Sequence, residues 1–406
     1  MNPPTTNRSL IGDLRRFPRT FWVLFIGVFI NRFGMFVVPF MALYLTSQGY
    51  TPGQAGTGIA AFGVGSFFAS FLGGYLTDRI GRRNTIALSM YLGASGMICL
   101  ALAQSYWAIV LAAAYTGFAG CLSHPATQSL VADLVPADLR LRAYATLRLA
   151  VNTGFALGAS AAGILAKYSY TWLFIGDAIT SATFATLALF FLPHGIRTSK
   201  EKAGWGPALR SIRKDHHLLV LILTTAIVAM VFDQLHATFG LQVTSSGFTT
   251  DTYGFLLGLN GALIVLFELP LTSYLTRFNP RRVIALGYVL LGLGFVVLTV
   301  AQSLPALILC VTLYTIGEML WLPTNSMYIA SLAPEDMRGR YMGTLSFSWS
   351  FATIFGPALG LRLFGFQPVL LWASCGLLTA LAALLLLVLP RTNATRAKMA
   401  QPLPAR

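Results

Sequence analysis

Long apolar runs constrain this chain more than any other feature of its sequence. Runs of about 20 residues or more recur through the 406 residues, with short polar connections between them. A helix of that length crosses a hydrocarbon core of roughly 30 Å. Since 56% of the residues are hydrophobic and only 10% are charged, against about a quarter in soluble domains, the runs predict a membrane protein. Alternating ten-residue strands are not seen, so a membrane barrel is not expected.

The apolar runs predict an all-α membrane protein with twelve transmembrane helices. No cleavable signal peptide is expected, because residues 1–20 are polar and basic and the apolar run after them is too long. The spans are expected at residues 20–46, 55–77, 84–103, 107–131, 143–166, 170–192, 218–242, 252–275, 283–302, 305–330, 341–365 and 369–390.

Positive charge is concentrated in alternate connections. The net charge is +15, and 24 of the 28 Lys and Arg residues lie in the two tails or in the connections after spans 2, 4, 6, 8 and 10. Short loops rich in Lys and Arg stay in the cytoplasm, so both termini are expected to be cytoplasmic. Lys167 and Arg362 are exceptions in the opposite connections. Topology explains the basic charge, and no nucleic-acid partner is expected.

The two halves of the chain repeat one plan. The longest polar stretch, residues 193–217, predicts a cytoplasmic linker between six-helix bundles at 1–192 and 218–406. Two separated loops keep nearly one register, which chance seldom produces. Tyr75-Leu76-Thr77 and Arg82-Arg83 recur 199 residues later, and Pro136, Asp138, Arg140, Arg142 and Thr146 match Pro334, Asp336, Arg338, Arg340 and Thr344 at an offset of 198. Such a duplication is typical of secondary transporters.

One charged loop interrupts the apolar sequence between spans 2 and 3. It reads GYLTDRIGRR, and its motif residues are Gly74, Asp78, Arg79, Gly81, Arg82 and Arg83. This loop resembles the signature of the major facilitator superfamily, and the resemblance extends over the whole twelve-span chain. The resemblance implies two pseudo-symmetric six-helix bundles that alternate access to a central site.

The same loop is expected to act as a gate on the cytoplasmic side. Gly81 permits a sharp turn, and Asp78 can hold a helix terminus or an arginine, so the cluster can latch the halves when that side is closed. Arginines alone would suffice for orientation, whereas Asp78 adds nothing to it. The second copy has Arg277 and Pro280 in place of the aspartate and the glycine. Only the first half is therefore expected to carry the full latch.

Ionisable residues inside spans are functional candidates, because a charge near the bilayer centre is costly unless it is paired or hydrated. The candidates for proton coupling or substrate binding are Asn31 and Arg32 in span 1, Asp177 in span 6, Asp233 and His236 in span 7, Glu268 in span 8 and Glu318 in span 10.

Each candidate keeps an alternative role. Arg32 needs an anion, either Asp177 in a structural pair or a substrate. Glu318, in an apolar segment after a glycine, can carry a proton, and Asp233 and His236 share a helix face at i and i+3. For the histidine alone, a satisfied buried side chain is the simpler interpretation. Glu268 is expected either to close the inner gate or to bind a proton. His124, before Pro125 in span 4, is expected to serve packing at a kink.

Small residues and prolines are expected to provide packing and hinges in spans 5 and 11. The residues concerned are Asn152, Gly154 and Gly158 in span 5 and Gly356 and Pro357 in span 11. In the superfamily, a glycine-proline motif in span 5 is associated with drug:proton exporters. This chain has Ala159 after Gly158, and span 4 has Tyr115-Thr116-Gly117 where an arginine is common.

The leading hypothesis is a proton-coupled exporter of amphipathic or cationic small molecules, resembling bacterial multidrug antiporters. Its pocket is expected to be apolar with a few acids, with side chains such as Met319 and Trp321 beside Glu318. The alternative is an importer or facilitator of an anionic metabolite that uses Arg32 as a substrate clamp. The expected setting is the inner membrane of a bacterium, with a monomer that works without a cofactor on the proton gradient.

Other classes of function fit less well. A sensor or scaffold is expected to carry a larger soluble appendage than the two short tails. No nucleotide-binding loop appears, so ATP-driven pumping and an enzyme are not expected. All four cysteines lie singly inside spans, which predicts neither a disulfide framework nor a metal site. They are Cys99, Cys121, Cys310 and Cys375.

Overall fold

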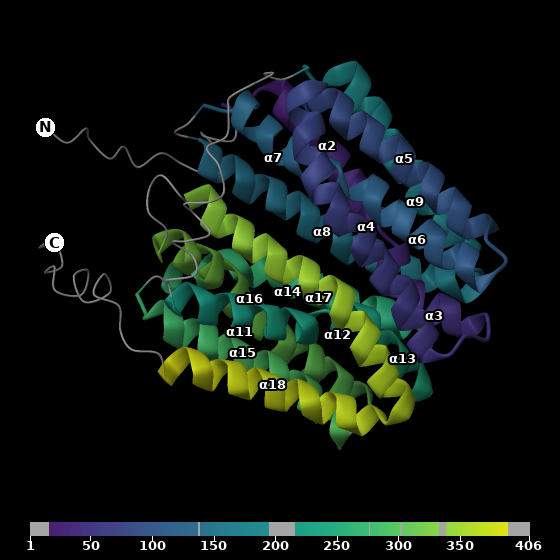
Figure 1. Cartoon of the computed structure of the whole chain (residues 1–406), viewed down its shortest axis with the longest axis vertical. Helices are drawn as coiled ribbons and strands as arrows, with labels where there is room; N and C mark the ends of the chain where they lie inside the picture. Colours follow the sequence, from purple (N-terminus) through teal and green to yellow (C-terminus); the bar gives the residue numbers. More distant parts are fainter. Residues whose placement is uncertain are drawn as a thin grey trace, which may run out of the picture. The chain divides into compact units, whose positions relative to one another are not determined.

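The described part of the chain is helical. The computed structural model describes residues 16–136, 139–194, 216–275, 277–300, 303–332 and 338–388, and no strand occurs among them (Figure 1). Most of the linker expected at 193–217, together with Asp138, Pro334 and Asp336 of the matched loops, lies outside these residues.

The first six expected spans correspond to eight helices. Spans 1 and 4 are each formed by two helices, and the other four spans by one helix each. The helices are α2 (Arg19–Phe33), α3 (Val37–Ser47), α4 (Pro52–Arg79), α5 (Arg82–Leu102), α6 (Tyr106–Cys121), α7 (Ser123–Leu134), α8 (Arg140–Tyr168) and α9 (Thr171–Phe191).

The last six expected spans are likewise occupied by helices, and here span 7 is divided into three. The elements are α11 (His216–Phe232), α12 (Gln234–Ala237), α13 (Phe239–Ser245), α14 (Thr250–Leu275), α15 (Pro280–Val296) with the short 3₁₀ turn η1 (Val297–Thr299), α16 (Leu304–Leu332), α17 (Arg338–Phe366) and α18 (Pro368–Val388).

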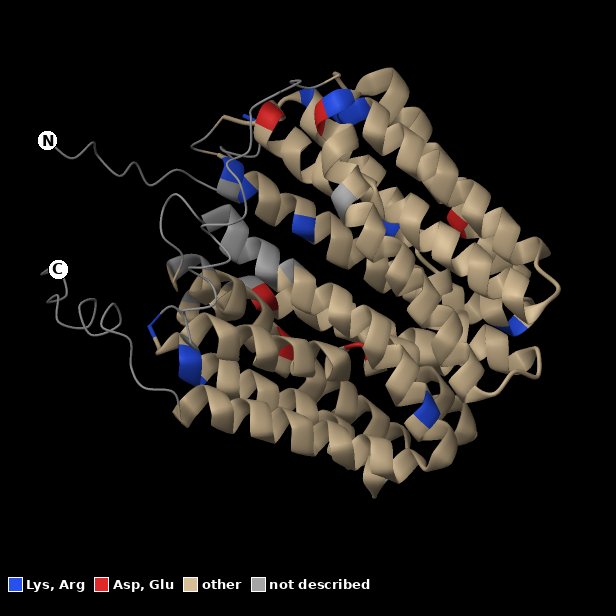
Figure 2. Ribbon diagram, viewed as in Figure 1, with Lys and Arg blue, Asp and Glu red and all other residues tan. Residues whose placement is uncertain are grey.

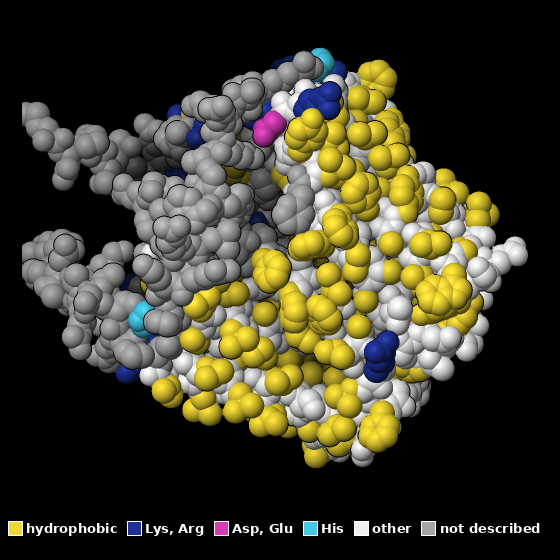
Figure 3. Space-filling view, in the orientation of Figure 1, with side chains coloured by type: hydrophobic (Ala, Val, Ile, Leu, Met, Phe, Trp, Pro, Cys, Tyr) yellow, Lys and Arg dark blue, Asp and Glu magenta, His cyan; other side chains and the backbone are white. Residues whose placement is uncertain are grey.

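Eleven helical segments among the described residues have the length and apolarity of membrane spans. The one expected span without a counterpart among these segments is span 11, at 341–365, which coincides with the 29-residue helix α17. Its serines, glycines and Arg362 make it less apolar. Large hydrophobic side chains also cover the outside, as Figure 3 shows for one face. An exposed apolar surface of this extent fits lipid contact, so the chain is a multi-pass membrane protein.

Two of the interrupted spans contain a proline where the break can be explained. Pro39 has no N–H to donate to the carbonyl of Met35, and α2 and α3 are separated at residues 34–36. Pro125 likewise cannot donate to the carbonyl of Cys121, and α6 gives way to α7 at Leu122. The expected kink in span 4 is therefore present. Span 7 is interrupted at residues 233 and 238 although the segment contains no proline.

Contacts divide the chain into two compact units that do not coincide with the sequence halves. Unit 1 comprises Met1–Glu201, Leu235–Leu266 and Pro357–Phe366, and unit 2 comprises Lys202–Gln234, Phe267–Gly356 and Gln367–Arg406. The division into two six-helix bundles, at residues 1–192 and 218–406, therefore stays a prediction.

Each unit has its own apolar core. In unit 1, side chains of α2, α5, α7, α8 and α9 pack together, with Phe21, Ile86 and Leu130 fully buried. In unit 2 the core is aromatic: Phe295 stacks on Trp372 at a ring distance of 5.2 Å and contacts Tyr314 at 5.5 Å. Charged residues are few along the helices of both units, as Figure 2 shows. The few that do lie inside spans therefore stand out.

Candidate functional site

The interruption of the first span lies beside the buried acid of span 6. Asp177 on α9 is only 4% exposed, and its carboxyl group interacts with the backbone N–H of Val37, the first residue of α3. A carboxylate at a helix N-terminus is favoured by the unpaired N–H groups and the helix dipole. The break in span 1 thus creates a binding place for the acid that an unbroken helix would lack.

A short chain of hydrogen bonds connects the two spans at this point. The amide of Asn31 donates to the Ser181 hydroxyl (3.2 Å), which donates to Oδ1 of Asp177 (3.3 Å). The second carboxylate oxygen, Oδ2, is buried and has no hydrogen-bond partner among the described residues. A buried carboxylate oxygen without a donor is costly unless a proton or another cation reaches it.

Glycines let the helices approach one another closely around the interruption. A Cβ at Gly34 would lie 1.7 Å from the Thr180 hydroxyl oxygen, so only glycine fits against α9 there. A Cβ at Gly154 or Gly158 on α8 would lie 2.7 Å from the Phe29 carbonyl or 2.1 Å from the Phe33 carbonyl, respectively. The two predicted packing glycines therefore support the end of α2. Asn152, two residues before Gly154, is half-buried.

Arg32 faces a different set of side chains. Its Nη1 donates to Sδ of Met35 (3.1 Å), and its charge also acts on Cys121 and His124 of span 4. Asp177 is within electrostatic range, but no ion pair between Arg32 and a carboxylate occurs in the described part of the chain. The structural Arg32 to Asp177 pair is thus not formed as a direct contact.

The second unit places another acid at a helix interruption. Asp233 lies in the turn between α11 and α12, half-buried, beside the Thr353 hydroxyl of α17. Its Oδ2 has no hydrogen-bond partner among the residues that the structure describes. The next residue, Gln234, donates to the carbonyls of Met230 (2.8 Å) and Gly356 (2.9 Å). Gln234 was missed by sequence reasoning because it is uncharged.

Gly356 fits closely beside this turn. A Cβ there would lie 3.1 Å from the Met230 carbonyl and 3.5 Å from Cβ of Asp233. Pro357 follows within α17, where it removes one backbone donor. These two predicted hinge residues therefore lie at the interruption of span 7, in the way that Gly154 and Gly158 lie at the interruption of span 1.

The expectation that Asp233 and His236 share one helix face is wrong. The helix ends at Phe232, Asp233 is in a turn, and His236 belongs to the four-residue α12. The ring of His236 instead makes an edge contact with Phe155, at 5.6 Å between ring centroids. This contact agrees with the simpler interpretation of a packed histidine.

The remaining acids of unit 2 lie on separate helices. Glu268 on α14 is buried and Glu318 on α16 is half-buried. Met319 and Trp321, expected to line a pocket beside Glu318, are instead packed inside the unit. Trp321 is fully buried and stacks on Trp349 at a ring distance of 5.6 Å. The aromatic cluster leaves its indole no exposed face for a ligand.

The charged loop between spans 2 and 3 has the expected sharp turn. Gly81 joins α4 to α5 with a φ of 90°, which a side chain would strain. A Cβ at Gly73 would lie 2.5 Å from the carbonyl of Leu122, between α6 and α7, whereas the next residue, Gly74, has open space around it. Arg79 bonds to the Tyr75 hydroxyl (3.0 Å), and Asp78 is half-buried at the end of α4.

Arg82 provides the strongest contact of this loop. It forms an ion pair with Asp133 at the end of α7 (3.0 Å), and both side chains are largely buried, at 7% and 17% exposure. Arg83 contacts His194 after α9. The Arg82 pair lies within unit 1, so it ties spans 3 and 4 together, and the latch between halves remains a prediction. Asp133 was not identified from the sequence.

The second copy of the motif uses its arginine differently. Arg281, which corresponds to Arg82, donates to the carbonyls of Leu386 (3.1 Å from Nε) and Leu387 (3.3 Å from Nη2) near the end of α18. A cation at the C-terminus of a helix is favoured by the unpaired carbonyls. The first copy thus relies on a carboxylate partner and the second on backbone carbonyls.

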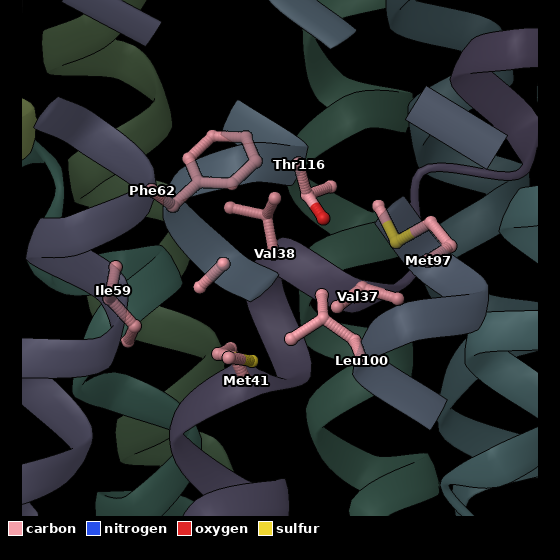
Figure 4. Close-up of a pocket in the computed structure, with 9 residues that line it drawn as sticks. Val37, Val38, Met41, Ile59, Phe62, Met97, Leu100 and Thr116 are labelled. Carbon is pink, nitrogen blue, oxygen red and sulfur yellow. The ribbon is translucent and has the colours of Figure 1, made fainter. Parts of the chain in front are cut away.

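Two small apolar pockets lie beside α3 inside unit 1, and Figure 4 shows the first of them. Val37, Val38 and Met41 of α3 face Phe62, Met97 and other side chains across it. The second pocket lies against α3 and α9. Neither is lined by a charged residue, and most of α3 is buried.

Comparison with protein families matches the Major Facilitator Superfamily over residues 24–249 and 236–405. The multidrug resistance protein MdtH of Aeromonas hydrophila is 27% identical over 388 residues, 93% of this chain and 96% of the relative. A Na(+), Li(+), K(+)/H(+) antiporter of Planococcus maritimus is 24% identical over 364 residues, 81% and 85% of the two chains. The uncharacterized transporter YqjV of Bacillus subtilis is 26% identical over 348 residues, 84% and 85%.

Solved structures with the same fold are more distant in sequence. The nucleoside transporter NupG matches with a TM-score of 0.76 at 14% identity, over 95% of this chain and all (100%) of that one. A POT family transporter in complex with 5-aminolevulinic acid matches with a TM-score of 0.78 at 16% identity, over 91% and 96%. At these identities the matches establish the fold alone.

Proposed function

Since this chain belongs to the Major Facilitator Superfamily and is a transporter rather than an enzyme, we propose that it exports amphipathic or cationic small molecules in exchange for protons. The observation that carries the proposal is the state of two acids inside spans. Asp177 and Asp233 each have a carboxylate oxygen without a hydrogen-bond partner among the described residues. Such acids can take up a proton or attract a cationic compound.

Relatives support the same function. MdtH is named a multidrug resistance protein and the Planococcus maritimus relative is named a cation/proton antiporter. Alternating access would let protons from outside release the cargo and let deprotonation inside reload the site. We propose a monomer in a bacterial inner membrane, with both termini in the cytoplasm and the proton gradient as the only energy source.

A transport assay in proteoliposomes tests this function. With an acidic lumen, outward proton flow is expected to drive accumulation of ethidium, a permanently charged cation, above the level in protein-free vesicles. Glu318→Gln and Asp233→Asn are expected to reduce the initial rate about tenfold or more, since each removes a candidate proton carrier. Ethidium uptake that does not depend on the proton gradient and is unchanged in both variants would show that the exporter mechanism is wrong.

A second candidate is import or facilitated transport of an anionic metabolite. The observation that favours it is Arg32, whose guanidinium group makes no ion pair with a described carboxylate and is half-buried. Such a group can clamp a substrate carboxylate or phosphate. A panel of radiolabelled anions distinguishes the two functions: uptake that is lost in Arg32→Met and weakened in Arg32→Lys, with no response to ethidium, supports the import alternative.

A further inference from the structure

The network at the first interrupted span has the features of an ion site. The acid of this network, Asp177, is only 4% exposed, and one of its carboxylate oxygens has no hydrogen-bond partner among the described residues. The other oxygen already accepts from Ser181, which in turn accepts from Asn31. The open oxygen is therefore the position left for a ligand.

Two hydroxyl groups of α9 lie in this region. Thr180 donates its hydroxyl to the Asp177 backbone carbonyl (3.0 Å), and the missing side chain of Gly34 lets that hydroxyl oxygen lie against the interrupted backbone. Ser181 adds a second hydroxyl oxygen beside the carboxylate. Hydroxyl and carboxylate oxygens at an interrupted span are the kind of ligands that coupling ions use in membrane transporters.

The charge of the network limits the ligand to a small monovalent cation. The described residues contain no group of three or more His, Cys, Asp or Glu side chains that could hold a metal ion, so a divalent metal does not fit. One carboxylate is balanced by one positive charge. Arg32 lies within electrostatic range but is turned toward Met35 and span 4, and does not neutralise the acid by direct contact.

Other ionisable groups on the helices around α9 lie elsewhere. Tyr44 of α3 packs against Phe174, and Tyr91 of α5 bonds to Thr186 (2.9 Å), more than two turns beyond Asp177. Lys167 of α8 pairs with Asp251, Arg148 lies near the opposite end of α8, and Cys99 of α5 is exposed. Arg32 is therefore the charged group on these neighbours that acts on Asp177.

We propose that Asp177, with Ser181, Asn31 and the interrupted backbone at Gly34, forms the ion-coupling site of unit 1, which binds one small monovalent cation, either a proton or an alkali ion. The inference rests on the proposed coupling and names its site. Binding at Oδ2 would neutralise the carboxylate and weaken its attraction for the N-terminus of α3. Occupancy is thereby linked to the position of the half-helix α3, whose first residue contacts the carboxyl group.

Binding can be measured without transport. The purified full chain in detergent is titrated with LiCl, NaCl or choline chloride at two pH values, with thermal unfolding and an indicator of released protons as the two readouts. One expected outcome is a higher midpoint of thermal unfolding for wild type in LiCl or NaCl than in choline chloride. The other is that wild type binds a titratable proton and responds to neither Li⁺ nor Na⁺. The first outcome assigns an alkali ion that competes with the proton, and the second assigns a proton alone.

Either response is expected to disappear in Asp177→Asn and to persist in Thr183→Val, which removes a hydroxyl of the same helix outside the network. Ser181→Ala keeps the charge and removes a hydroxyl that donates to the carboxylate. It is expected to change proton binding about tenfold, toward tighter binding, because the anion loses a stabilising hydrogen bond, and to weaken the binding of an alkali ion by loss of a hydroxyl oxygen. This variant keeps the test open if Asp177→Asn does not fold. Unchanged ion responses in both variants would overturn the assignment.

Failure of this inference is distinct from failure of the proposed function. If gradient-driven ethidium transport depends on Glu318 but not on Asp177, the exporter function stands and the ion site lies in unit 2.

Discussion

At the scale of single residues, the site depends on which side chains are absent as much as on which are present. Gly34 has no Cβ, and the Thr180 hydroxyl occupies the space where one would lie. Asn31 and Ser181 are 150 positions apart in sequence, yet a hydrogen bond joins them. The polar network and the close helix contact therefore stabilise the same interruption.

Gly34→Ala is expected to destabilise the protein by about 1–3 kcal/mol, because the new methyl group overpacks a close contact. The midpoint of thermal unfolding in detergent, followed by tryptophan fluorescence, measures the effect. Gly120→Ala serves as the control, since a Cβ there meets nothing within 4 Å. The double variant Gly34→Ala/Thr180→Gly is expected to recover stability. Equal midpoints for Gly34→Ala and Gly120→Ala would contradict the close contact.

The sequence predicted part of this site and not the rest. Asn31, Arg32 and Asp177 were identified because polar groups inside apolar runs are costly. Ser181 and Thr180 carry no charge, and small hydroxyl residues are common in spans as they bond to their own helix. Their roles depend on which helix lies opposite, and a single sequence does not contain that information.

At the scale of helices, unit 1 contains a contact seam between α8 and α14 that is built mainly from backbone. A Cβ at Gly163 would lie 2.7 Å from the Thr250 carbonyl, and one at Gly254 would lie 2.7 Å from the Ala159 carbonyl. Lys167 and Asp251 form an ion pair (2.7 Å) at the end of the seam, at 43% and 36% exposure. Exposed pairs contribute only about 0.2–1 kcal/mol, so backbone approach dominates the seam.

Gly254→Leu is therefore expected to reduce stability and transport strongly, whereas Lys167→Met is expected to leave both within about twofold of wild type. Phe255→Leu, at a neighbouring position whose side chain is 53% exposed, controls for a change on α14 outside the seam. Unfolding midpoints and initial transport rates are compared for the three variants. A larger loss in Lys167→Met than in Gly254→Leu would show that the ion pair, and not close packing, holds the helices.

Helix interruptions were only partly predictable. Hydrophobicity continues across residues 34–36 and across Leu122, so each span reads as one helix. The kink in span 4 was expected from Pro125, while Pro39 could have given the same signal for span 1. In span 7 no proline marks the breaks around Asp233, which led to the incorrect pairing of that residue with His236 on one helix face.

At the scale of the whole molecule, the helical, multi-pass fold class followed from the length of the apolar runs, because the bilayer sets a minimum length for every crossing. The repeat and the charged loop then identified the superfamily, which the family match confirms. The orientation in the membrane is a separate prediction that rests on the distribution of Lys and Arg.

Cysteine labelling tests the orientation. In a Cys99→Ser background, which removes the exposed native thiol, Lys167→Cys is expected to react with a membrane-impermeant maleimide in intact cells. Arg83→Cys is expected to react only after the cells are opened, because its loop is predicted to be cytoplasmic. The reverse pattern would invert the proposed topology.

The division of the first span also affects how the protein enters the membrane. With 15 residues in α2 and 11 in α3, neither piece alone reaches the roughly 20 residues that a crossing needs. The polar pair Asn31 and Arg32 lies where the pieces meet. During biogenesis this segment is therefore expected to be incompletely inserted into the bilayer until α8 and α9 have been synthesised and have packed around it.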